Sequence, residues 1–99
     1  MKKLTVTEEA ADWFISELGL EQGDYVRFVV KIYGGIPTVH PGYYLGLATG
    51  KEGTVTIKDE VKGITFYFSE QDAWLLEEHD LHIKNTEQGL EYEFNEQGP

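Results

Sequence analysis

The sequence predicts a single α+β domain that is mostly β, in which a curled or sandwiched mixed/antiparallel sheet is covered by two helices. Most of the 99 residues fall into short stretches where apolar and polar side chains alternate, the pattern of half-buried strands. Two other stretches begin with residues that favour a helix start. A chain of this length supplies one core, so we expect one domain over residues 1–95 and a frayed tail over 96–99.

The first predicted elements are a short strand and a helix. Leu4 and Val6 alternate with polar neighbours, which indicates a strand. Thr7 precedes two glutamates and is typical of a helix N-cap, and Gly19 is placed to end the helix after about residue 18. Trp13 lies outside the apolar arc of this helix. We therefore expect it to be half covered at the helix margin.

Three strands are expected in the middle of the chain. Residues 24–32 alternate over nine positions, and residues 43–49 alternate again with one face made of small residues. A glycine-rich turn over 50–53 leads to a further strand around 55–57. The predicted core face of the first of these strands consists of Val26, Phe28, Val30 and Ile32.

The C-terminal part predicts a strand, a helix and two more strands. Residues 64–68 are rich in β-branched and aromatic side chains. Ser69 and Asp72 have the spacing of a capping box, which predicts a short helix over about 70–78. Strands near 81–84 and 90–94 follow, the last with apolar residues inward and glutamates outward.

Net charge is the strongest global signal. Eighteen acidic against eight basic residues give a net charge of −10. Such a surface repels phosphate backbones and anionic lipids, so we expect neither a nucleic-acid nor a membrane partner. The charge serves solubility, and the specific alternative is a basic protein partner.

The chain contains no cysteine. This absence excludes disulfides, thiolate nucleophiles, zinc held by cysteine and iron–sulfur clusters held by thiolates. No apolar run resembles a signal peptide or a membrane span, so a cytoplasmic location is expected. Phosphate-binding loops and hydrolase motifs are also missing from the sequence, and we expect no enzyme activity and no cofactor.

The segment YGGIPTVHPGYY, residues 33–44, is the main candidate for a site. Pro41 and Gly42 suit the centre of a type II turn, and the glycine pair before them permits positive φ or close backbone approach. The segment is either a shaped connection between strands or a recognition loop. The candidate binding residues are Tyr33, Gly34, Gly35, His40, Tyr43 and Tyr44.

Two other groups have structural and functional interpretations. His79 and His82 could grip a metal on a helix, but the alternation after Asp80 indicates a strand, which places them on opposite faces. We therefore predict no metal site. Arg27, the only arginine, is expected to pair with a carboxylate, and anion capture is the alternative.

Four segments in order resemble the HesB/IscA-like proteins, the iron–sulfur cluster biosynthesis domain family. They cover about residues 1–94, and the match is most similar to a short, cysteine-free bacterial branch. The resemblance implies a strongly curved mixed β structure, a partial barrel or sandwich. The segments read TEEAADWF, VRFVVKIYGG, HPGYYLGLA and GITFYFSEQDAWLLEEHDLHI.

The cysteine ligands of that family have no counterpart here. Its carriers place one cysteine just after the glycine pair, where this chain has Ile36, and a Cys-Gly-Cys near the end, which is also missing. Gly34 and Gly35 match only as backbone. The resemblance therefore implies a non-enzymatic protein with an accessory role in iron–sulfur cluster assembly or iron homeostasis. It also implies a protein partner from that process, and it is compatible with a homodimer.

The alternative function is a binding module of unrelated purpose. In this interpretation the 33–44 loop would hold a small molecule or a protein, with His40 and the tyrosines as contacts. A mononuclear iron site made from histidine and tyrosine is a minor variant of the same idea.

Overall fold

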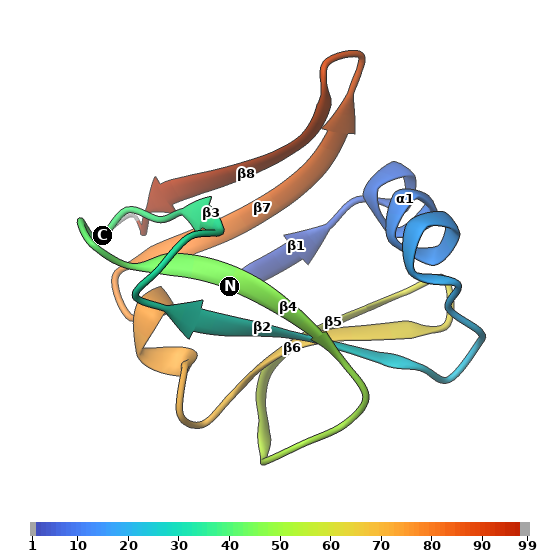
Figure 1. Ribbon diagram of the computed structural model, residues 1–99, viewed down its shortest axis with the longest axis horizontal. Helices are drawn as coiled ribbons and strands as arrows, with labels where there is room; N and C mark the ends of the chain where they lie inside the picture. The colour runs from blue at the N-terminus through green and yellow to red at the C-terminus, as the bar shows by residue number, and fades with distance from the viewer. Residues whose placement is uncertain (1, 98–99) are drawn as a thin grey trace.

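The computed structural model describes residues 2–97 and shows two mixed β-sheets, one α-helix and one 3-10 turn within that range (Figure 1). The prediction of a mostly β fold is therefore correct, and the prediction of two covering helices is wrong. The elements are β1 (Leu4–Val6), α1 (Glu8–Leu18), β2 (Tyr25–Lys31), β3 (Ile36–Pro37), β4 (Tyr44–Thr49), β5 (Val55–Val61), β6 (Ile64–Ser69), η1 (Ala73–Leu76), β7 (His79–Thr86) and β8 (Gly89–Glu96).

The strands form a three-stranded sheet A, with the order β1-β7-β8, and a five-stranded sheet B, with the order β3-β4-β2-β6-β5. Each sheet contains one parallel pair, β1 with β7 and β2 with β6, and its remaining pairs are antiparallel. Parallel strands cannot be joined by a tight hairpin, so a long stretch of chain separates the two members of each pair. Between β1 and β7 lie α1, the strands β2 to β6 and η1, and between β2 and β6 lie the strands β3 to β5.

The two sheets meet where β1 passes β5. The side chain of Asp59, on β5, is buried and accepts a hydrogen bond from the backbone N–H of Val6 at 2.8 Å. It also forms an ion pair with the ammonium of Lys2 at 2.7 Å. These contacts replace a strand ladder at this place. The strands therefore follow one another as β8-β7-β1-β5-β6-β2-β4-β3, an open roll whose free edges are β8 and β3.

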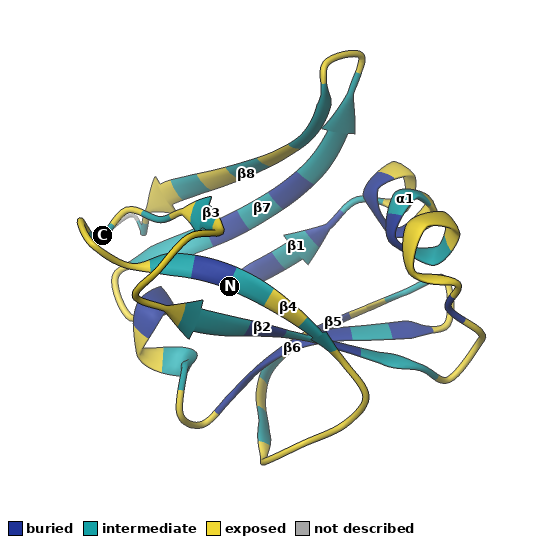
Figure 2. Ribbon diagram, in the orientation of Figure 1, coloured by how far each residue is buried: buried dark blue, intermediate teal, exposed yellow. Residues whose placement is uncertain are grey.

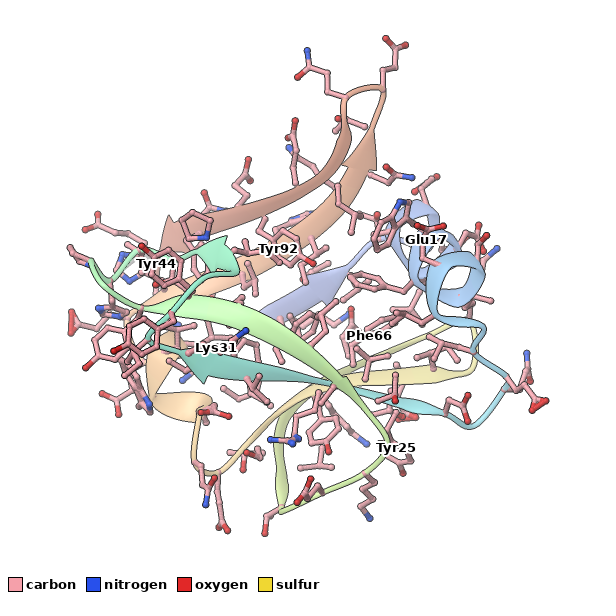
Figure 3. The ribbon with its side chains drawn as sticks, viewed as in Figure 1. Glu17, Tyr25, Lys31, Tyr44, Phe66 and Tyr92 are labelled. Carbon is pink, nitrogen blue, oxygen red and sulfur yellow. The ribbon has the colours of Figure 1, made fainter. Side chains whose placement is uncertain are left out.

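The core fills the space between the sheets and beneath α1 (Figure 2). Phe14 of α1 lies 5.3 Å from Phe66 and 6.3 Å from Phe28, measured between ring centroids, so the helix packs on both central strands of sheet B. Figure 3 shows Phe66 and Tyr92 pointing into the space between the sheets. Burying each such side chain stabilises the fold by about 1.5–3 kcal/mol.

Helix α1 begins and ends as predicted. The hydroxyl of Thr7 accepts a hydrogen bond from the N–H of Ala10 at 3.1 Å, and Gly19 adopts a φ of +63° at the C-terminal end. Trp13 is half-buried with its ring edge-on to Phe14 at 5.2 Å. The predictions for the cap, the helix end and Trp13 are confirmed.

The predicted helix over 70–78 is a single 3-10 turn instead. Asp72 makes no side-chain cap, and its backbone oxygen accepts from the N–H of Leu75 at 3.2 Å, an i to i+3 bond. Leu75 and its neighbour Leu76 are both fully buried. The chain then enters β7 at His79, only three residues after η1, so there is no room for further helical turns.

The carboxylate of Asp72 is used elsewhere. Burial raises its pKa, and the backbone of Val30 and the charge of Arg27 act in the opposite direction. Asp72 therefore faces β2 rather than the start of a helix, which explains why the capping-box pattern misleads.

The ends of two predicted strands also differ. The sequence predicts Ile32 in the core, but β2 ends at Lys31 and the side chain of Ile32 is 64% exposed. Strand β8 continues through Glu96, and the side chain of Gln97 donates to the backbone oxygen of Leu76 at 3.1 Å. Residues 98–99 of the predicted tail lie outside the described residues, and the domain limits stay a prediction.

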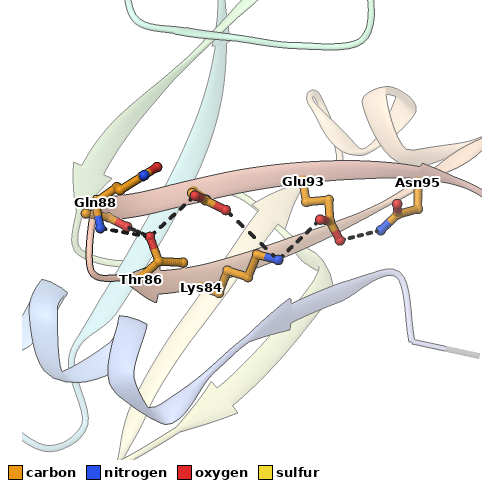
Figure 4. Close-up of polar contacts among 7 residues, drawn as sticks. Lys84, Thr86, Gln88, Glu93 and Asn95 are labelled. Atoms are coloured by element: carbon orange, nitrogen blue, oxygen red, sulfur yellow. Dashed lines mark hydrogen bonds and ion pairs between the residues drawn. The ribbon is translucent and has the colours of Figure 1, made fainter.

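The outer face of the β7–β8 hairpin is polar, as predicted (Figure 4). Glu93 accepts a hydrogen bond from Asn95 at 3.2 Å and lies 3.3 Å from the ammonium of Lys84. The pKa of Glu93 is lowered mainly by the hydrogen bond from Asn95, and then by the hydrogen bond and the positive charge of Lys84.

Between residues 2 and 97 we find no helix with the length and apolar character needed to cross a membrane.

Candidate functional site

The chain crosses over β4 between β2 and β3. Strands β2 and β3 lie on either side of β4, and Gly35 passes over the backbone of Leu45. A side chain at Gly35 would place its Cβ 2.5 Å from the oxygen of Leu45, and the φ of Gly35 is +114°. Gly34 has a φ of +57° with open space around it. The predicted roles of the glycine pair, positive φ and close approach, are confirmed.

The loop between β3 and β4 ends in a turn that presents two side chains. The N–H of Tyr43 donates to the oxygen of His40 at 3.1 Å, and Gly42 has a φ of +85°, which fits the predicted type II turn. Thr38 fixes the loop from inside, because its hydroxyl accepts from the N–H of His40 and lies 2.9 Å from the oxygen of Tyr43.

His40 and Tyr43 lie against aromatic residues from distant parts of the chain. Trp74, on η1, has its ring centroid 5.2 Å from that of Tyr43 and 5.5 Å from that of His40. His79, the first residue of β7, lies 6.2 Å from His40. We call the rings of His40, Tyr43 and Trp74 the aromatic shelf. It joins a loop of sheet B to the segment that leads into sheet A.

Beyond His79 lies a hollow with a volume of about 380 Å³. We call it the acidic hollow, because three of its lining residues are glutamates. His79 also lines it and lies close to His40 of the shelf. Gln97 closes one side, where its side chain donates to Asp80 at 2.9 Å. The glutamates of the hollow are Glu77, Glu78 and Glu96.

Exposed apolar side chains are concentrated in the segment that carries the loop of the shelf. Within residues 2–97, seven large apolar side chains are exposed, and four of them belong to the 32–43 segment. Trp74, which touches Tyr43, is a fifth. Such grouping is typical of a surface that meets another molecule, since scattered apolar residues need no explanation but a patch does. The four in the segment are Ile32, Tyr33, Val39 and Tyr43.

The predicted site residues do not all meet. His40 and Tyr43 share the shelf, whereas Tyr33 is 81% exposed at the crossing over β4. Tyr44 is half-buried within β4, where it lies between Lys31 of β2 and Pro37 of β3. Figure 3 labels Lys31 and Tyr44 at this end of the sheet.

Trp74 and His79 were missed as site residues. Trp74 lies in the stretch 70–78 that the sequence predicts to be a helix, and His79 follows that stretch directly, so their approach to the loop is not visible in the sequence. The one signal in the sequence is the residue type of Trp74, since tryptophan is enriched among the residues that dominate protein interfaces.

Metal-binding chemistry finds no support in this region. Over residues 2–97 there is no group of three histidine, aspartate or glutamate side chains arranged to hold a metal ion. His79 and His82 lie on β7, which confirms the strand that separates them onto opposite faces. The Nδ1 atom of His79 is buried without a hydrogen-bond partner in the part of the chain that the structure describes.

Arg27 forms the expected pair with a carboxylate. Its guanidinium lies 3.2 Å from Glu52, which belongs to the β4–β5 connection. A second hollow of about 240 Å³ adjoins this pair. Glu52 and Glu70 both line it, so its charge does not favour an anion.

Two known proteins are similar to this chain over most of its length. A protein named pyruvate dehydrogenase inhibitor, from Bacillus subtilis (strain 168), is 39% identical over 94 residues, which are 95% of this chain and 98% of the relative. The chain belongs to the family of this protein. An uncharacterized protein of Staphylococcus saprophyticus is 31% identical over 84 residues, 82% of this chain and 85% of the relative. No model of a known protein family matches the chain.

These findings correct the assignment to the HesB/IscA-like family. The relative is named for inhibition of pyruvate dehydrogenase, and no family model supports a HesB or IscA match. The four resembling segments cover most of α1, β2, the end of the β3–β4 loop with β4, and the stretch from β6 to β7, which are elements of the framework of the fold. They carry none of the cysteines that would have tied the chain to iron–sulfur chemistry.

Proposed function

We propose that this protein is a non-catalytic regulator that inhibits a pyruvate dehydrogenase by binding to it. The observation that carries the proposal is the 39% identity to a pyruvate dehydrogenase inhibitor over 95% of this chain and 98% of the relative. Because the alignment spans both chains almost from end to end, the proposed activity would belong to this whole chain. A cytoplasmic location alongside that enzyme is part of the proposal.

The surface of the molecule supports a protein partner. Trp74 and Tyr43 are 38% and 39% exposed and form one patch, and tryptophan and tyrosine are the residues that most often dominate protein interfaces. The net charge of −10 would speed the encounter with a basic surface. The predicted binding role of the 33–44 loop thus becomes part of a protein-recognition surface.

The proposal is tested by adding the purified protein to purified Bacillus subtilis pyruvate dehydrogenase complex. We expect pyruvate-dependent reduction of NAD⁺ to fall in a saturable manner as the protein concentration rises. A matched control is the same protein after heat unfolding, which keeps the charge of −10 but loses the surface. Full enzyme activity at a large excess of folded protein, with no complex detected by sedimentation, would refute the proposal.

The accessory role in iron–sulfur assembly remains a prediction that no comparison supports. Homodimer formation also stays a prediction. Sedimentation of the protein alone, run as the reference for the binding experiment, measures it.

A further inference from the structure

The aromatic shelf and the acidic hollow are neighbours on the molecule. His79 connects them, since its ring lies 6.2 Å from His40 of the shelf and also lines the hollow. The two parts have complementary chemistry. One offers exposed ring faces and the other offers carboxylates.

The shelf is held in one arrangement before any partner arrives. Tyr43 and Trp74 pack edge to face at 5.2 Å with an interplanar angle of 78°, and Thr38 ties the turn that carries His40 and Tyr43. Ordering costs on binding are therefore small. Exposed tryptophan and tyrosine faces are good partners for lysine and arginine cations and for the alkyl stems that carry them.

The hollow holds uncompensated negative charge. Within residues 2–97, none of the carboxylates of Glu77, Glu78 and Glu96 takes part in an ion pair or a side-chain hydrogen bond. Elsewhere on the molecule cations do find carboxylates. Those that pair are Lys2, Arg27, Lys58, Lys62 and Lys84.

We propose that the shelf and the hollow together bind a basic segment of the partner, with a lysine or arginine side chain lying over Trp74 and its cation among the glutamates of the hollow. The inference rests on the proposed function for the source of that segment, pyruvate dehydrogenase. Charge complementarity selects this occupant, because nucleic acid, anionic lipid and acidic peptides are repelled by the same carboxylates.

The first experiment measures the binding of pyruvate dehydrogenase complex to four variants. We expect Trp74→Ala and the double variant Glu77→Gln/Glu78→Gln each to weaken binding about tenfold or more. The controls are Leu18→Ala, whose side chain is 38% exposed like that of Trp74, and Glu17→Gln/Glu87→Gln, which removes the same charge at exposed positions. Figure 3 labels Glu17 on α1, at the opposite end of the molecule from η1.

The second experiment uses a probe that does not depend on the enzyme. A synthetic octa-arginine peptide is titrated into ¹⁵N-labelled protein, and the two indole N–H signals are followed. Trp74 should shift and Trp13, packed against Phe14 on α1, should not. Glu77→Gln/Glu78→Gln should reduce the shift of Trp74, and Glu17→Gln/Glu87→Gln should leave it unchanged.

The outcomes separate the two proposals. If the enzyme binds and all variants bind equally, the docking surface is wrong and the proposed function stands. If the enzyme does not bind but the peptide moves Trp74 selectively, the surface chemistry is right and the proposed function is wrong. Equal shifts of both indole signals, or an equal loss of binding in the two glutamate double variants, would reflect the overall negative charge. Either result would refute the proposed docking surface. Thermal melts establish that each variant is folded.

Discussion

Gly34 and Gly35 are neighbours in the sequence, but the structure constrains them differently. Both have positive φ, yet only Gly35 lies where a Cβ atom would meet backbone, at 2.5 Å from the oxygen of Leu45. The position is fixed because the chain must cross over β4 to place β3 on the other side. The absence of a Cβ atom at Gly35 therefore makes the crossing and the loop after it possible.

We predict that Gly35→Ala destabilises the protein by more than Gly34→Ala. The strained φ costs about 1–3 kcal/mol at either position, and Gly35→Ala adds the displacement of β4. Urea unfolding of the two variants beside wild type measures the difference. Equal unfolding midpoints would contradict the crossing over β4.

The amino-acid pattern predicted most strands because many of them have one buried face, while β6 was indicated by its β-branched and aromatic residues. Alternation marked β2 and β8, and capping chemistry marked both ends of α1. These signals are local, so they are present in any single sequence. The prediction of a helix at η1 was wrong because the structure of this segment depends on where Asp72, Leu75 and Leu76 pack. Such packing is tertiary information that local patterns do not contain.

The candidate site was predictable only in its loop half. Pro41 and Gly42 predict the turn, and with it the positions of His40 and Tyr43. Trp74 is more than thirty residues away, and nothing in the spacing places it against Tyr43. Contacts between separate elements are set by the packing of the two sheets, which a single sequence does not reveal.

Strand β8 contributes a titratable group to the core. Burial raises the pKa of Tyr92 to about 12 from its ordinary value of 10.0. The folded state therefore keeps the phenol proton in a pH range where the unfolded chain has lost it. Stability from this group is complete below pH 10 and decreases as the pH rises through the folded value.

We predict that the free energy of unfolding of wild type falls between pH 10 and 12 relative to that of Tyr92→Phe. The loss from this one group is at most about 1.4 kcal/mol for each pH unit. Urea unfolding of both proteins at pH 8 and pH 11 gives the comparison, and the other basic groups cancel in the difference. A constant difference across this range would show that Tyr92 is solvated in the folded state.

At the scale of the whole molecule, the two sheets meet at the contact between β1 and β5. The two sheets share no strand ladder there, and Asp59 joins them through Val6 and Lys2. The open roll contrasts with a closed barrel, in which continuous ladders would carry this role. A buried carboxylate that accepts a backbone N–H is a directional link and fixes how the sheets sit against each other.

We predict that Asp59→Ala destabilises the protein by about 1–3 kcal/mol, because the buried N–H of Val6 loses its acceptor. Glu60→Ala is the matched control, since its neighbouring carboxylate pairs with Lys58 on the surface and such pairs contribute less than about 1 kcal/mol. Chemical denaturation measures both variants. Equal effects would mean that the sheets are held by apolar packing alone.

The residues of the shelf and the hollow come from the β3–β4 loop, from η1 and the two residues after it, and from β7 and the end of β8, so they span the passage from sheet B to sheet A. A chain in which the two halves have not come together has no such surface to offer. Recognition would then report that the molecule has been assembled correctly. By mass action, binding at this surface would also shift the equilibrium toward the state in which the two sheets are joined.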